Sequence, residues 1–149
     1  MQTRLSLSLL FMLSVTLLSC GDDEIISYQT SRDQAIDIKL RQGERVLLRP
    51  GAVIVEFSKT EEESRCPEDV TCVWAGQAVI RIRLNPDHPS PAEFTLTIPG
   101  LVQTPHEGSP FDTLGYRWTL LRLDPYPHAS QPRPEPPFYE ALIRIQEPD

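Results

Sequence analysis

Apolar and polar residues alternate along most of the chain with a period of two. In residues 35–41, for example, Ile36, Ile38 and Leu40 fall on one side and charged residues fall on the other. This alternation is typical of strands with one buried face. The same pattern predicts six further strands, at residues 44–49, 52–58, 77–84, 92–98, 115–123 and 138–145.

Turn residues separate these segments. Gln42-Gly43 predicts a tight hairpin, and Pro50-Gly51 fits the central positions of a type II turn. Leu120-Leu121 interrupts the alternation, which predicts a bulge or a change of face. No segment has a long helical period. We therefore expect one all-β domain over residues 35–149, an antiparallel β-sandwich of about seven strands, with a small β-barrel as the alternative.

The N-terminal stretch has a different pattern. Arg4 precedes an apolar run at residues 5–18, which is too short for a membrane span of about 20 residues and is typical of a secretory signal. The run ends in Leu17-Leu18-Ser19-Cys20, which resembles the lipobox of bacterial lipoproteins. The resemblance implies that residues 1–19 are a signal peptide and that Cys20 is acylated as the mature N-terminus. The alternative is an ordinary signal peptide with a chance cysteine.

An acidic run, Asp22-Asp23-Glu24, follows this cysteine directly. It resembles the export signal of surface-displayed lipoproteins in some Gram-negative bacteria. That resemblance implies an outer membrane lipoprotein at the cell surface, with the periplasmic face as the alternative. Clustered acids also resist packing, so we expect residues 20–34 to be a solvated tether.

The charge balance narrows the choice of partners. The whole chain has a formal net charge of −7, and removal of residues 1–19 takes away Arg4 and leaves −8. Phosphate backbones and anionic lipid surfaces both repel such a domain. We therefore expect no nucleic-acid partner, and we expect attachment to the membrane through the N-terminal lipid alone.

Cys66 and Cys72 are the two cysteines left after acylation of Cys20. An exported chain meets an oxidising compartment, where paired thiols form disulfides. A structural zinc site needs four ligands, usually in two close pairs, and a thioredoxin-type centre needs Cys-x-x-Cys. The three histidines show no ligand spacing (His88, His106 and His128). A structural disulfide is therefore expected, with free thiols and a metal site as the alternatives.

The segment around these cysteines resembles a motif of small bacterial lipoproteins. In this chain its core reads Ser64-Arg65-Cys66-Pro67-x-x-Val70-x-Cys72-Val73-Trp74-Ala75-Gly76-x-Ala78. The likeness extends loosely over residues 35–146, and the motif often has Asp where this chain has Glu63. It implies an all-β lipoprotein domain and brings no activity.

Within the motif, several residues have expected structural roles. Pro67 should fix the backbone at the start of a tight turn inside the ring. Trp74 should pack over the sulfur atoms. Gly76 should allow a conformation or a close approach that a side chain would block. Arg65 belongs to the motif with no separate role.

Three other groups of residues could carry chemistry. The proline-rich segment 124–137, with Tyr126, His128 and Arg133, is a recognition loop or, more in keeping with its composition, a plain crossover. The acids at 61–63 with Asp69 favour a solvated patch over a calcium site, because no spaced ligand loop surrounds them. Four aromatic residues could form a sugar-binding platform, although strand spacing favours the core (Tyr116, Trp118, Phe138 and Tyr139).

No catalytic motif is present, and we assign no catalytic residue, metal or cofactor. The sequence favours a lipid-anchored, non-enzymatic binding or accessory module of the envelope or cell surface, with a protein or a glycan as ligand. The alternative is a small envelope hydrolase, for example one acting on glycans, whose site the sequence does not reveal.

The lipobox yields the first testable prediction. Cys20→Ala removes the thiol that would be acylated, so precursor should accumulate or the protein should leave the membrane fraction. Membrane fractionation and intact-mass measurement check this result. A mutant that is processed and sediments like the wild-type protein would contradict the anchor.

Overall fold

The computed structural model describes residues 25–29, 34–49, 51–100, 108–132 and 138–148. The expected signal peptide 1–19, the lipidation site Cys20, the acidic run at 22–24, His106 and Arg133 lie outside these residues. No helix in the described part of the chain is long and apolar enough to cross a membrane.

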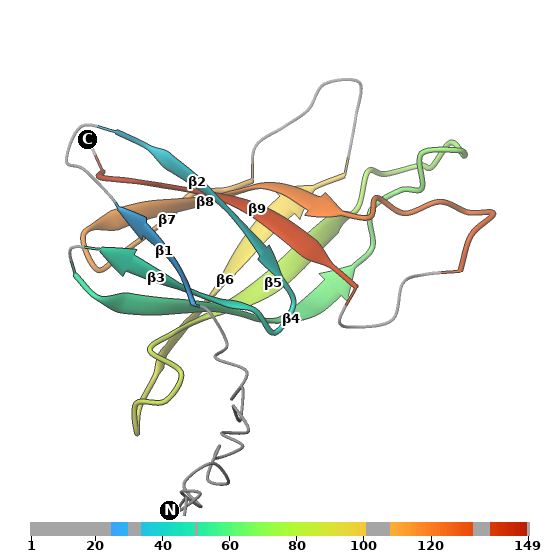
Figure 1. The fold of residues 1–149 in the computed structure, drawn as a ribbon. Coiled ribbons are helices and arrows are strands. Elements are labelled where there is room, and N and C mark those ends of the chain that lie inside the picture. Colours follow the sequence, from blue (N-terminus) through green and yellow to red (C-terminus); the bar gives the residue numbers. More distant parts are fainter. Residues whose placement is uncertain (1–24, 30–33, 50, 101–107, 133–137, 149) are drawn as a thin grey trace, which may run out of the picture.

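Two packed sheets form the domain (Figure 1). The five-stranded sheet has the order β1-β3-β4-β5-β6, with bounds Ile26–Gln29, Arg45–Arg49, Val53–Glu63, Gln77–Leu84 and Ala92–Pro99. The four-stranded sheet has the order β2-β9-β8-β7, with bounds Ile36–Arg41, Glu140–Gln146, Tyr116–Asp124 and Phe111–Thr113. The all-β sandwich is confirmed, with two short strands, β1 and β7, beyond the seven that alternation predicts.

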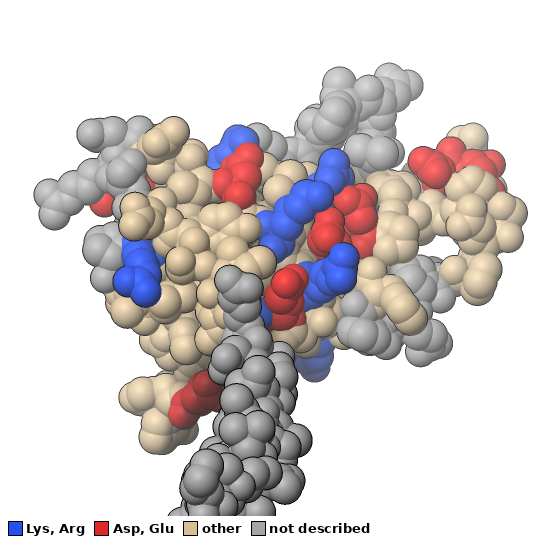
Figure 2. Space-filling model, in the orientation of Figure 1, with Lys and Arg blue, Asp and Glu red and all other residues tan. Residues whose placement is uncertain are grey.

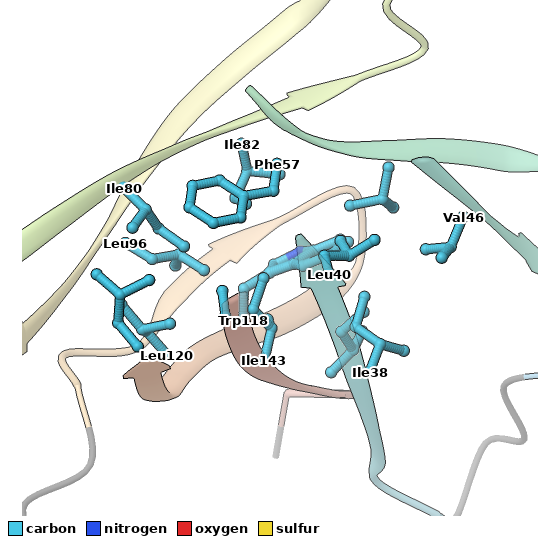
Figure 3. Packing of buried hydrophobic residues seen from close by; sticks show 14 of the residues in the cluster. Ile38, Leu40, Val46, Phe57, Ile80, Ile82, Leu96, Trp118, Leu120 and Ile143 are labelled. Atoms are coloured by element: carbon cyan, nitrogen blue, oxygen red, sulfur yellow. The ribbon is translucent and has the colours of Figure 1, made fainter. Parts of the chain in front are cut away.

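The core lies between the inner faces of the two sheets. Along β5, four alternate residues are fully or almost fully buried, and along β9 three are (Ala78, Ile80, Ile82, Leu84, Ala141, Ile143 and Ile145). Trp118 and Phe57 are the largest side chains in this layer (Figure 3). The period-two pattern therefore identified the buried faces correctly.

The turn after β2 connects the two sheets. Glu44 N donates to Arg41 O at 2.8 Å, and Gly43 has a φ of +87°, which favours glycine. However, β2 pairs with β9 whereas β3 pairs with β1 and β4, so the hairpin prediction for Gln42-Gly43 is wrong. β2 and β3 each have one apolar face. Because the two strands lie in opposite sheets, both apolar faces pack into the same core.

Several local details differ from expectation. β1 lies within the expected tether 20–34 and pairs in parallel with β3 at the edge of its sheet. The left-handed residue of the β3–β4 turn is Ala52, with a φ of +49°, rather than Gly51. The bulge predicted at Leu120-Leu121 is confirmed, because the register between β8 and β9 shifts between Leu120 and Arg122.

One end of the sandwich carries two long connections side by side. The β4–β5 connection, residues 64–76, holds both paired cysteines, and residues 125–132 begin the β8–β9 connection (Figure 1). The β5–β6 loop projects at the opposite end. Glu68 N donates to Pro127 O at 3.1 Å, which confirms that the first two connections touch. We call this region the loop end.

Candidate functional site

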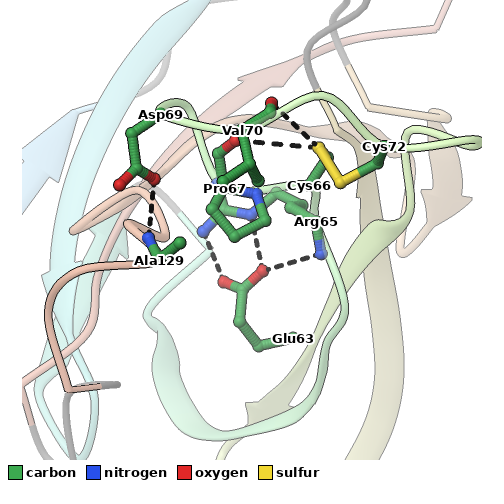
Figure 4. The surroundings of a disulfide bond; sticks show 8 residues. All are labelled: Glu63, Arg65, Cys66, Pro67, Asp69, Val70, Cys72 and Ala129. Atoms are coloured by element: carbon green, nitrogen blue, oxygen red, sulfur yellow. Dashed lines mark hydrogen bonds and ion pairs between the residues drawn. A yellow bond between two sulfur atoms is a disulfide. The ribbon is translucent and has the colours of Figure 1, made fainter.

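A disulfide joins Cys66 to Cys72 at the loop end, with Cα atoms 5.9 Å apart (Figure 4). Inside the ring, Val70 N donates to Pro67 O at 3.3 Å and closes a turn. The disulfide bond and the tight turn beginning at Pro67 are therefore confirmed. The bridge restricts a short local loop.

The stem of this loop is also tightly packed. Ser64 N donates to Gln77 O and Cys66 N donates to Ala75 O, both at 2.8 Å. Gly76 has a φ of +69°, and a Cβ there would lie 1.9 Å from Ser64 O. Both reasons given for a glycine at this position are confirmed, because any side chain would clash with the backbone opposite.

A buried ion pair lies beneath the loop. The Arg65 and Glu63 side chains are only 2% and 7% exposed, and the Arg65 guanidinium contacts both carboxylate oxygens of Glu63, with Nε donating to Oε1 at 2.8 Å. The paired fork geometry is the one in which Arg binds carboxylates most strongly. Glu63 is thus held by Arg65 and is not a free carboxylate.

Arg65 also reaches the opposite sheet. Its Nη1 donates to Leu123 O at 3.0 Å, and its guanidinium lies 4.6 Å from the centre of the Tyr126 ring. The first contact gives a buried N–H donor a hydrogen-bond partner, without which its burial would cost free energy. The second is a cation–π contact. One side chain therefore joins the end of β4, the end of β8 and the proline-rich segment.

Asp69 forms a second link between the two connections. Its carboxylate accepts from Ala129 N at 2.6 Å and from Ser130 N at 3.3 Å, and it lies 2.9 Å from His128 Nδ1. The hydrogen bond from Ala129, together with the other contacts, lowers the pKa of Asp69 below its usual value. The described part of segment 124–137 is therefore docked on the disulfide loop.

A pocket of about 200 Å³ lies at this junction. Its lining combines Glu63 with residues of the proline-rich segment and Tyr139 (Pro125, Tyr126, Pro127, His128, Gln131 and Pro132). Ligand sites for drug-sized molecules usually measure about 300–1,000 Å³, so this pocket suits at most a small group. Its one carboxylate already contacts Arg65.

Apolar side chains project from the disulfide loop. Val73 is fully exposed, Trp74 is 64% exposed and Val70 is 47% exposed. We call these three residues the apolar tip. Most of the Trp74 surface faces solvent, so any packing of its indole over the sulfurs, as the sequence led us to expect, covers only a minor part of the residue.

The other candidate groups are dispersed. Trp118 and Tyr139 are buried, which agrees with a core role, whereas Phe138 is 69% exposed, so no four-residue aromatic platform forms. Glu61 contacts Arg81, and the other two acids of that run are bound elsewhere. Among the described residues, no group of three His, Cys, Asp or Glu could hold a metal ion.

Asp69, His128 and Ser130 are the residue types of a hydrolytic triad, but their geometry differs. In such a triad the carboxylate contacts one ring nitrogen and the hydroxyl contacts the other. Here Asp69 Oδ2 and Ser130 Oγ both lie 2.9 Å from Nδ1 of His128. One nitrogen cannot donate to the carboxylate and accept from the hydroxyl, so the cluster orders the loop rather than relaying a proton.

Comparison of the chain with protein-family models, with curated proteins and with solved structures gives no match. The likeness of the cysteine motif to small bacterial lipoproteins therefore stays a prediction.

The disulfide yields a second prediction. Closing so short a loop contributes about 2 kcal/mol to the free energy of unfolding, so Cys66→Ser/Cys72→Ser should lower the melting temperature by several degrees. The domain should stay folded, because Arg65 and Asp69 still hold the loop. Thermal melting followed by circular dichroism measures this. Free thiols in oxidised protein, or zinc that co-purifies and is lost in Cys72→Ser, would refute the structural role.

Proposed function

We propose that the protein is a lipid-anchored lipoprotein of the outer membrane, displayed at the cell surface, whose folded domain is a non-enzymatic binding or accessory module. The Leu17-Leu18-Ser19-Cys20 sequence and the acidic run at 22–24 support the anchor and its location. The apolar tip supports binding as the role of the domain. The tip is the surface that contacts the partner.

The observation that carries this proposal is the exposure of Val73 and Trp74 on a loop that is held in one conformation. Contiguous exposed apolar side chains mark interaction sites, and Trp is enriched at the energetic centres of protein interfaces. The disulfide, the Gly76 close approach and the Arg65–Glu63 pair all restrict the loop that carries them. A loop ordered before binding loses less conformational entropy in the complex.

The anchor would keep the domain near its membrane. Ile26 begins β1 only six residues after Cys20, and six residues span at most about 20 Å. The partner would therefore lie within the same envelope layer or at its surface.

Removing the indole tests this contact surface. The lipid-anchored protein, extracted in mild detergent from the cells that make it, should elute as a complex larger than the protein alone, corrected for detergent. Trp74→Ser should abolish that complex, because the indole supplies most of the apolar contact. Its melting temperature should change by about 2 °C or less, because the side chain is mostly exposed.

Leu114→Asn is the matched control. Leu114 is also apolar and 56% exposed, it lies in the β7–β8 turn, and its φ of +53° suits Asn. This variant should keep the complex. A wild-type protein that elutes alone, or a Trp74→Ser complex of unchanged size and yield, would count against the proposal.

A further inference from the structure

Charges on the two sheet faces neutralise one another. Asp37 pairs with Arg144 across β2 and β9, and Glu93 contacts both Arg81 and Arg83 on the five-stranded sheet. On the side of the molecule seen in Figure 2, Lys and Arg atoms (blue) lie next to Asp and Glu atoms (red). These ion pairs leave little net charge on the sheet faces to attract a partner.

The loop end has a different balance. Residues 61–77 contain five carboxylates and one guanidinium, that of Arg65, which is buried against Glu63. Glu61 contacts Arg81 and Lys59. The remaining three acids have no Lys or Arg partner among the described residues, and we call them the acidic rim (Glu62, Glu68 and Asp69).

The pKa values of two rim carboxylates are lowered, and the rim faces solvent in part. Hydrogen bonds from Gln77 and Ser64 lower the pKa of Glu62, as the backbone of Ala129 does for Asp69. The Glu68 side chain is 57% exposed. Among the residues that the structure describes, the basic group near Glu68 and Asp69 is His128, within 4.0 Å of both, and it adds positive charge only when protonated.

Two members of the acidic rim, Glu68 and Asp69, occupy the same short loop as the apolar tip, and Glu62 lies near the end of β4. Glu68 and Asp69 lie inside the disulfide ring with Val70, and Val73 and Trp74 follow the ring directly. A surface that covers the tip must also approach these carboxylates. Figure 2 shows acidic atoms at the end of this loop on the visible face.

From this arrangement we infer that the partner is a protein with an apolar pocket bordered by Lys and Arg side chains. The inference rests on the proposed function and specifies the chemistry of its partner. Lys and Arg would complement the rim and steer association, whereas an anionic lipid surface would be repelled by the same charges. The partner is therefore a protein surface rather than a membrane.

Photo-crosslinking in the cells that make the protein tests this inference. A photoreactive phenylalanine analogue replaces Val73, whose side chain is fully exposed, in the full-length chain. We expect a protein adduct whose mapped attachment peptide lies beside Lys or Arg. Glu68→Lys should lower the adduct yield about tenfold, and Glu68→Gln should lower it less, because charge reversal adds repulsion.

Asp87→Lys is the control for charge alone. Asp87 is 73% exposed in the β5–β6 loop, at the opposite end of the sandwich (Figure 1), and this variant should leave the adduct yield unchanged. If Glu68→Lys leaves the yield of a protein adduct undiminished, or if Asp87→Lys lowers that yield equally, the inferred Lys and Arg border of the partner's pocket is wrong. The binding role of the domain would still stand. Adducts with lipid alone overturn the protein partner. An absence of adducts overturns the proposed function itself.

Discussion

A buried guanidinium holds the loop end together. Arg65 is almost without solvent contact, so each donor on its side chain needs a partner inside the protein. Glu63 supplies two oxygens, Leu123 supplies a carbonyl and Tyr126 supplies an aromatic face. These partners come from three segments, and the loop that bears the apolar tip therefore has one position relative to both sheets.

The sandwich provides the frame for this contact. β4 ends in Glu63 and β8 ends in Asp124, so the ends of strands from the two sheets meet where Arg65 enters. The disulfide acts within the β4–β5 connection alone, whereas Arg65 and Asp69 link that connection to the proline-rich segment. Removing one member of a buried ion pair usually costs about 3–5 kcal/mol, more than the disulfide of so short a loop contributes.

Local features of this structure could be predicted from the sequence, and distant contacts could not. Alternation identified Ile38, Leu40 and Ile80 as buried because side chains on a strand alternate between its faces. It could not assign β2 and β3 to different sheets, since both arrangements bury the same residues. The Cys66–Cys72 bridge was predictable because the cysteines are close in the sequence and because an exported chain, which the N-terminal pattern predicts, meets an oxidising compartment.

The Arg65–Tyr126 contact and the Asp69–Ala129 hydrogen bond join residues about sixty positions apart, and no periodicity encodes them. A partial signal was present, because an acidic residue, Glu63, lies two residues before Arg65. The outward position of Trp74 had no such signal. An indole beside a disulfide has the same sequence pattern whether it covers the sulfurs or faces a partner.

Hydrogen exchange of Arg65→Lys tests most directly whether one side chain orders the whole loop end. Lysine keeps the charge but lacks the planar guanidinium that binds the Glu63 carboxylate and the Leu123 carbonyl at the same time. The amides of Cys66, Glu68 and Ala129 should lose protection together, while those of β5 and β9 keep it. Exchange that rises in the disulfide loop alone, or in neither connection, would contradict this account.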